Sequence, residues 1–245
     1  MIEWRKREKV CFVNACVNRR RKAIYMILSV VLCALAMSLV DAVIKPPYFV
    51  KSMVKMILFL MVPFFYFLVN RAELKEVKRL FCIKGKELRK AFFWGIFVYG
   101  FIFFAYLLLR PVFDFSGIVG KLTADTGVSA ENFVFVSLYI SLINSFLEEI
   151  FFRGFGFLML KRVVSAPFAF FFSALLFALY HAGMTMGYFH IGVFLLTLFG
   201  LFVAGMLFNF LDFKSESIYP SWLTHMFTNF AINTIGFILF GILPI

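Results

Sequence analysis

The stretch of sequence that decides the fold is residues 132–160, NFVFVSLYISLINSFLEEIFFRGFGFLML. It is longer than the roughly 20 apolar residues that a helix needs to cross a bilayer. The same stretch contains three charged residues, Glu148, Glu149 and Arg153. A charge at the centre of a membrane helix costs about 2.5–3.5 kcal/mol, whereas each Phe, Leu or Ile returns only about 0.3–0.6 kcal/mol. The pattern therefore predicts a membrane-spanning helix whose charges are kept for a function.

The composition of the whole chain also indicates a membrane protein. Of its 245 residues, 63% are hydrophobic and 16% are charged, whereas soluble globular domains carry about 25% charged residues. This balance excludes a disordered protein, a disulfide-stapled secreted domain and a cytosolic enzyme. The four cysteines are irregularly spaced, and we expect reduced thiols at Cys11, Cys16, Cys33 and Cys82.

Seven apolar segments are long enough, or nearly so, to span a bilayer: residues 23–44, 53–69, 91–109, 132–160, 166–182, 190–211 and 221–243. Helices are the expected form, because lipid offers the backbone no hydrogen-bond partners and the short alternating segments of a β-barrel are missing. The second segment is the weakest of the seven, since it is short and contains Lys55 and Pro63. The predicted fold is an all-α, polytopic membrane helix bundle of about seven transmembrane helices.

The formal net charge of +12 is unevenly distributed along the chain. Twenty of the 25 Lys and Arg residues lie in residues 1–22, in the loop 70–90, or at Arg153, Lys161, Arg162 and Lys214. Because basic loops stay in the cytoplasm, we expect a basic cytoplasmic tail (1–22) followed by one transmembrane domain (23–245) that ends outside. Residues 34–36 (ALA) look like a signal-peptidase site, but the long basic lead favours an uncleaved anchor. The charge thus indicates orientation and contact with membrane lipid, and we expect no nucleic-acid partner.

Helical spacing separates the roles of the three charges in residues 132–160. Glu149 and Arg153 are four residues apart, share a helix face and are predicted to form an ion pair. Glu148 lies about 100° round the helix and is left without that partner. A carboxylate without a partner in an apolar environment suits a general base, so Glu148 is the predicted reactive group.

Two later helices supply the remaining polar candidates. Glu148 and His181 are almost equidistant from the turn at residues 164–165, so an antiparallel hairpin places them opposite each other. His225 and Asn229 are four apart on the last helix and can donate hydrogen bonds toward one point, or serve as polar contacts between helices. His190 is expected at the surface, in the outer loop beside Tyr188.

The expected heights of these groups along their helices do not match in the simplest arrangement of the bundle. His225 lies only about 7–8 Å above Pro220, while Glu148 and His181 lie some 20 Å above their turn. Either the hairpin extends below the cytoplasmic membrane surface, or the last helix starts before Pro220. The basic residues Lys161 and Arg162 favour the first option, which places the site in the inner half of the bilayer, open to the cytoplasm.

Three motifs on successive predicted helices resemble those of the CAAX prenyl protease and bacteriocin-processing (CPBP, or Abi) intramembrane proteases. They are Glu148-Glu149-Ile-Phe-Phe-Arg153 for EExxxR, Phe177-Ala-Leu-Tyr-His181 for FxxxH, and His225-Met-Phe-Thr-Asn229 for HxxxN. The resemblance covers about residues 130–235, with no departure at a motif position. The first three helices match the family only in general character.

The resemblance implies an intramembrane endopeptidase, located in the bacterial plasma membrane, that acts on a peptide or membrane-protein substrate. Glu148 and His181 would activate a water molecule for attack on a peptide carbonyl, and His225 and Asn229 would form the oxyanion hole. Glu149, Arg153 and Phe177 would have structural roles. The substrate and the oligomeric state stay open.

Three alternatives remain at this point. Zinc is possible as a cofactor, with Glu148, His181 and His225 as ligands and an open fourth position, although the HExxH spacing is missing and a metal-free reaction is favoured. A non-catalytic bacteriocin-immunity or scaffolding protein of the same fold would keep the motifs for stability or binding. A small transporter or channel subunit is less consistent with the sequence, which shows no two matching halves.

Overall fold

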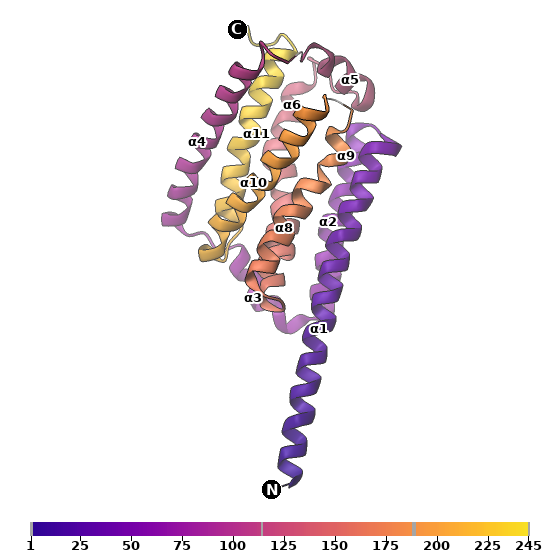
Figure 1. The fold of residues 1–245 in the computed structure, drawn as a ribbon, viewed down its shortest axis with the longest axis vertical. Helices are drawn as coiled ribbons and strands as arrows, with labels where there is room; N and C mark the ends of the chain where they lie inside the picture. The colour runs from indigo at the N-terminus through magenta and orange to yellow at the C-terminus, as the bar shows by residue number, and fades with distance from the viewer. Residues whose placement is uncertain (1, 114, 188–189, 245) are drawn as a thin grey trace.

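The computed structural model describes residues 2–113, 115–187 and 190–244, with side chains from Cys16 onward except that of Ser116. Cys11 and the four basic side chains before residue 16, together with Tyr188, therefore lie outside the described part. Within that part every regular element is helical (Figure 1). The predicted all-α class is confirmed.

Six helices are long and apolar enough to cross a membrane in the described residues: Cys16–Ile44, Tyr48–Val69, Gly85–Leu109, Phe133–Arg162, Ala166–Thr185 and Ile191–Ser215. The first is made of α1 (Ile2–Leu39) and η1 (Val40–Ile44), and the second and third are α2 (Tyr48–Val69) and α4 (Gly85–Leu109). The fourth joins α6 (Phe133–Tyr139), η3 (Ile140–Asn144), α7 (Ser145–Glu148), η4 (Glu149–Met159) and η5 (Leu160–Arg162). The fifth joins α8 (Ala166–Tyr180) and α9 (Ala182–Thr185), and the sixth is α10 (Ile191–Ser215).

A seventh long helix, α11 (Tyr219–Leu239), runs beside α4 and α10 (Figure 1). It is 21 residues long, enough to cross the hydrocarbon core, but its buried His225, Asn229 and Asn233 lower its hydropathy. The two chain ends lie at opposite ends of the bundle, as an odd number of crossings requires (Figure 1). The structure is thus consistent with the predicted count of about seven.

The start of the second helix was predicted wrongly. α2 begins at Tyr48 and not near residue 53, so Lys51 lies inside the helix together with Lys55, and both are buried. Lys51 forms an ion pair with Asp41 of η1, and Lys55 forms one with Glu148 of α7. Hydropathy alone counts each lysine as a cost, whereas a lysine paired within the bundle is tolerated.

The basic connections gather at one end of the bundle. Lys84 donates to the backbone oxygen of Ser215 at 2.6 Å, and Arg162 pairs with Glu76 of α3 (Leu74–Leu80) at 2.8 Å. Arg162 also pairs with Glu216, just after α10, at 3.0 Å. The short helix α5 (Ser116–Thr126) lies at the opposite end (Figure 1). The cytoplasmic N-terminus was predicted from this same segregation of basic residues. The orientation of the bundle in the membrane stays a prediction.

Glu148 and His225 lie close together in the structure, and two features of the hairpin between η5 and α8 reduce the expected mismatch of their levels. Because Arg162 is paired with Glu216, the turn of the hairpin is level with a residue that precedes the start of α11. In addition, the 11 residues of η4 are π-helical, with more residues per turn and so less rise than an α-helix. Both features act in the direction that lowers Glu148 toward the level of His225, while α11 begins only one residue before Pro220.

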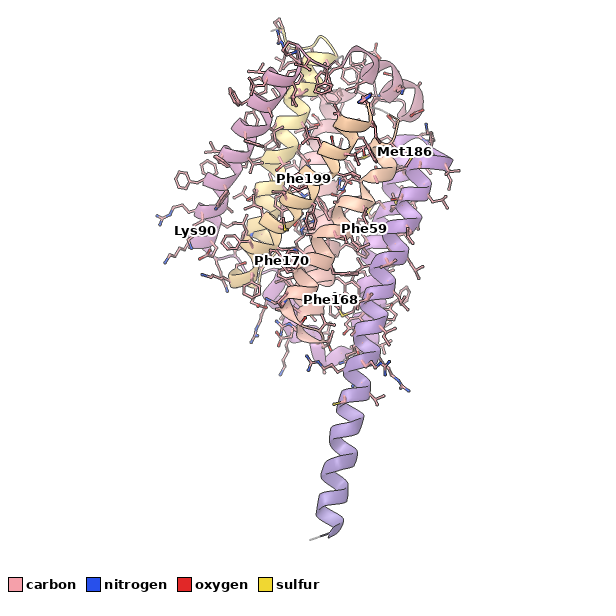
Figure 2. The ribbon with its side chains drawn as sticks, in the orientation of Figure 1. Phe59, Lys90, Phe168, Phe170, Met186 and Phe199 are labelled. Atoms are coloured by element: carbon pink, nitrogen blue, oxygen red, sulfur yellow. The ribbon has the colours of Figure 1, made fainter. Side chains whose placement is uncertain are left out.

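Aromatic side chains fill the interior and also cover the lipid-facing surface. Phe59 of α2, labelled in Figure 2, is fully buried, with its ring 4.2 Å from that of Phe151 and 5.6 Å from that of Tyr180. In contrast, Phe168 and Phe199 are exposed on the outside of the bundle (Figure 2). Phe59 thus fixes α2, which carries Lys55 one turn earlier, against η4 and α8.

The crossing of α8 and α10 depends on a small residue. A Cβ atom added at Gly205 would lie 3.0 Å from the Cα atom of Ala174, a backbone atom that cannot yield without moving the helix. We therefore expect Gly205→Ala to lower the free energy of unfolding by about 1–3 kcal/mol, as overpacking does. Thermal unfolding in detergent is the measurement. Gly200 is the matched control on the same helix, because nothing lies within 4 Å of its added Cβ. A Gly205→Ala protein as stable as Gly200→Ala would show that the helices are not in contact here.

Candidate active site

Glu148 is the last residue of α7, at the centre of the bundle, and is only 2% exposed. Its Oε1 atom accepts hydrogen bonds from Lys55 Nζ at 3.1 Å, Asn144 Nδ2 at 2.9 Å and Tyr180 OH at 3.1 Å. The inference that Glu148 has no partner is therefore wrong. It considered the helix of Glu148 alone, whereas Lys55 reaches the carboxylate from α2 and Tyr180 from α8.

The other carboxylate oxygen of Glu148 faces two histidines. Its Oε2 atom lies 3.8 Å from Nε2 of His181 and 3.9 Å from Nε2 of His225. Glu148 and His181 are thus opposite each other, as their equal distances from the turn predicted. The separations are too long for direct hydrogen bonds. One small volume is therefore faced by three atoms from three helical segments: Glu148 Oε2, His181 Nε2 and His225 Nε2.

The second nitrogen of each histidine fixes the ring. Nδ1 of His181 lies 2.7 Å from the backbone oxygen of Phe177, and Nδ1 of His225 lies 2.8 Å from Oε1 of Glu149. A carbonyl or carboxylate oxygen can only accept, so Nδ1 carries the hydrogen in both rings. In a neutral ring Nε2 then has a free lone pair. Both imidazoles consequently present an acceptor to the volume beside Glu148.

Glu149 and Arg153 form the ion pair that their spacing predicted. Both side chains are fully buried, and Arg153 Nε lies 3.3 Å from Glu149 Oε2. The guanidinium is stacked on aromatic rings, 4.0 Å from the centre of Phe177 and 4.9 Å from that of Phe208. Phe177 therefore contacts Arg153 with its ring and holds His181 with its carbonyl. Arg153 is thus paired with Glu149, and Glu149 accepts a hydrogen bond from His225.

Asp212 of α10 connects this buried group to the start of α11. Its side chain is fully buried, its Oδ1 accepts from the backbone nitrogen of Ser221 at 3.0 Å, and it lies close enough to interact electrostatically with Arg153. A carboxylate at a helix N-terminus satisfies a free backbone N–H and interacts favourably with the helix dipole. Asp212 thus fixes the first turn of the helix that carries His225.

Asn229 is buried one turn after His225 but is engaged with a different segment. Its Nδ2 atom donates to the backbone oxygen of Ile140 in η3 at 3.1 Å. Asn233, a further turn along α11, donates to Ser137 O at 3.1 Å and to Ser141 Oγ at 3.0 Å. These contacts are the polar links between helices that were the alternative interpretation of Asn229. The amide of Asn229 has a second N–H, which the Ile140 contact does not use.

Sequence reasoning missed three residues of this site, Lys55, Asn144 and Tyr180. Asn144 is four residues before Glu148, so it was within reach of the same spacing argument. Tyr180 contacts Glu148 from another helix, 32 residues away, and helical spacing gives no signal for it. Lys55 gave a signal too, as a charge inside an apolar segment, but it was counted as a weakness of that segment. His190 is exposed at the start of α10, as expected.

Zinc was the alternative cofactor, with Glu148, His181 and His225 as its possible ligands. Among the residues that the structure describes, no group of three His, Cys, Asp or Glu side chains is arranged to hold a metal ion. The Lys55 ammonium also forms an ion pair with the Glu148 carboxylate, and its positive charge would repel a metal cation bound to the same carboxylate. The reaction proposed below is therefore derived from the side chains alone, and a metal-free reaction stays a prediction.

Comparison with known proteins adds one match. Residues 130–231 match the family model described as Type II CAAX prenyl endopeptidase Rce1-like. The range contains all three motifs, and it confirms the resemblance to the CAAX protease family that they indicated. No curated protein and no solved structure matches the chain significantly. At the level of the family, the match supports a membrane-embedded protease with a peptide or protein substrate.

Proposed function

We propose that this Rce1-like protein is an intramembrane endopeptidase in which Glu148 activates a water molecule to hydrolyse a peptide bond. The observation that carries the proposal is the difference between the surroundings of the two carboxylate oxygens of Glu148. Oε1 is held by three donors, whereas Oε2 is free and faces the lone-pair nitrogens of two histidines. A base needs a fixed orientation and one free oxygen, and Glu148 has both.

The spacing around Oε2 suits one water molecule. Two atoms that are 3.8–3.9 Å apart can each lie at about 2.8 Å from the same water, which is an ordinary hydrogen-bond distance. Such a water would donate one hydrogen to Glu148 Oε2 and the other to Nε2 of His181. Its remaining lone pairs would point away from the carboxylate, toward the side from which a peptide carbonyl can approach.

The proposed reaction can be followed through the transfer of one proton from the water to Glu148 and then to the amine. Glu148 Oε2 takes a proton from the water as the water oxygen bonds to the peptide carbon, and the carbonyl oxygen becomes an oxyanion. The bond from that carbon to the amide nitrogen then breaks, and the proton on Glu148 passes to the departing amine. His181 accepts a hydrogen bond from the water and keeps it aligned. The products are a carboxylic acid and an amine, and Glu148 is regenerated.

His225 and Asn229 are proposed to stabilise the oxyanion, and the geometry sets a condition on His225. Because Nδ1 already donates to Glu149, Nε2 can donate only when the ring is the imidazolium. Glu149 balances that charge. Asn229 would contribute its second N–H. One such donor typically contributes about 10²–10³ in kcat.

Substrate and location are part of the proposal. The family supports a peptide or protein substrate, and we propose a membrane-associated one that is cut in the inner half of the bilayer, from a cavity open to the cytoplasm. In support, the hairpin that carries Glu148 and His181 ends in the basic residues Lys161 and Arg162. Basic residues of this kind mark the cytoplasmic side of membrane proteins.

The experiment that tests the function is a cleavage assay in proteoliposomes. The purified protein is offered a farnesylated CAAX peptide, the same peptide without the lipid, and a peptide anchored by one transmembrane helix. Hydrolysis predicts one cut in at least one of them, with oxygen from ¹⁸O-labelled water in the new carboxylate. A protein that binds these peptides without cutting any of them would instead be a non-catalytic member of the same fold.

Removal of metal ions is expected to leave the activity unchanged. The predicted reaction uses Glu148 and two histidines with no metal step, and Lys55 already supplies the local positive charge. The measurement is the rate of cleavage after extensive chelation, with the residual metal content determined in the same sample. A loss of activity that zinc restores, and that magnesium does not, would contradict this prediction.

A further inference from the structure

Lys55 is a buried ammonium in direct contact with the proposed base. Its residue exposure is 5%, and its Nζ atom lies 3.1 Å from Glu148 Oε1. It also donates to Asn144 Oδ1 at 2.6 Å and lies 5.2 Å from the centre of the Tyr180 ring. A lysine held by a carboxylate, an amide oxygen and an aromatic face is fixed in position.

Asn144 closes a ring of hydrogen bonds around Lys55 and Glu148. Its Oδ1 accepts from Lys55 and its Nδ2 donates to Glu148 Oε1, at 2.6 Å and 2.9 Å. Tyr180 adds a third donor to the same oxygen. All three donors thus converge on Oε1 and none of them on Oε2. The orientation of the carboxylate is therefore set by donors from α2, η3 and α8 that all bind Oε1 and leave Oε2 facing the histidines.

The charge balance of Glu148 also depends on Lys55. The titratable or charged groups that face Glu148 are Lys55 and Tyr48 on α2, Tyr180 and His181 at the end of α8, and His225 on α11, with Arg153 farther along its own helix. Both tyrosines are neutral, both histidines present lone pairs in the resting site, and Arg153 is paired with Glu149. His225 would be charged only while it donates to the oxyanion. A buried carboxylate without a cation takes up a proton and becomes neutral.

We propose that Lys55 is a positioning residue of the active site: it keeps Glu148 ionised and turned so that Oε2 is the free oxygen. The inference rests on the proposed hydrolytic function and extends the site beyond residues 130–231, into a helix that the family match does not cover. Lys55 acts through Glu148 and makes no contact with the water. The first half of the chain therefore takes part in the chemistry of the second.

The first test is spectroscopic and needs no substrate. The protonation of Glu148 is followed by the infrared carbonyl band of a protonated carboxylic acid, with the protein in lipid nanodiscs at neutral pH. We expect the Lys55→Met protein to show a band that disappears in Lys55→Met/Glu148→Gln. The wild-type protein should show no band that Glu148→Gln removes. A Lys55→Met protein without such a band would overturn the proposal, because Glu148 would then be ionised without its lysine.

The second test is kinetic and uses whichever peptide the wild type cleaves. Lys55→Met should lower kcat at least about tenfold, within the range of a general base, while KM stays nearly constant. The activity should recover as the pH is raised and Glu148 ionises, and Lys55→Arg should restore part of it at neutral pH. Lys51→Met is the matched control, one turn away on the same face and paired with Asp41 instead. Unchanged kcat and an unchanged pH profile in Lys55→Met would overturn the inference and leave the proposed function intact. If the wild type cleaves no peptide, the function fails and the infrared comparison still decides on Lys55.

Discussion

Replacing Glu148 by glutamine is expected to lower kcat by about 10²–10⁴-fold, the usual contribution of a general base. Glutamine has the same shape and can still accept at Oε1, but its free end cannot take a proton from water. KM should change little, because the side chain is not expected to bind the ground state of the substrate. The measurement is the cleavage rate in proteoliposomes, at equal amounts of folded protein.

The single change has a second effect that needs its own control. It leaves the Lys55 ammonium buried without an anion, and breaking a buried pair costs about 3–5 kcal/mol. Lys55→Met/Glu148→Gln removes both charges together and should be close to wild type in stability, yet as inactive as Glu148→Gln. Glu131→Gln, at an exposed acid before α6, should leave the activity unchanged. Cleavage that survives in the double variant would exclude Glu148 as the base and with it the hydrolytic mechanism proposed above.

Replacing Arg153 by methionine is expected to produce the largest loss of stability, about 3–5 kcal/mol, because it leaves Glu149 buried without its cation. The guanidinium also loses its stacking on Phe177 and Phe208. Since whole domains are stable by only about 5–15 kcal/mol, the amount of protein in the membrane should fall strongly. Thermal unfolding in detergent and the membrane yield are the two measurements.

A double variant separates charge balance from catalysis. Arg153→Met/Glu149→Gln removes both charges and should recover much of the stability lost in Arg153→Met. Its activity should stay low, because a glutamine cannot stabilise the imidazolium of His225. Arg153→Lys should be intermediate, since lysine keeps the charge but not the planar group that stacks between the rings. If Arg153→Met is as stable as wild type, the buried pair does not hold η4 in place.

Much of the fold was predictable from the sequence because lipid restricts the possibilities. Apolar length predicted seven helices, of which six are apolar enough to span in the described residues and the seventh is α11. The charge segregation predicted that the basic loops lie together, as the contacts of Lys84 with Ser215 and of Arg162 with Glu216 show. The errors fell where polar groups satisfy one another inside the bundle. The prediction for α2 left out Lys51 and counted Lys55 against the helix, because a hydropathy count cannot detect that Lys51 pairs with Asp41 and that Lys55 pairs with Glu148.

The site was predictable as far as single helices and one hairpin allow. Spacing within a helix gave the pair of Glu149 and Arg153, and equal distances from a turn brought Glu148 to His181. The contacts of Lys55 and Tyr180 with Glu148 join residues 93 and 32 positions apart, which no periodicity reports. The π-helical η4 was not foreseen either, and it contributes to the height at which Glu148 meets His225.

The unequal surroundings of the two Glu148 oxygens bear on how an inhibitor of this site would be designed. A compound that imitates the hydrated peptide carbonyl would find one oxygen and two ring nitrogens ready to bind its hydroxyl groups. A compound that reaches for Oε1 would have to break three existing hydrogen bonds. Selective chemistry against this protein would therefore begin from gem-diol mimics sized for the space beside Oε2.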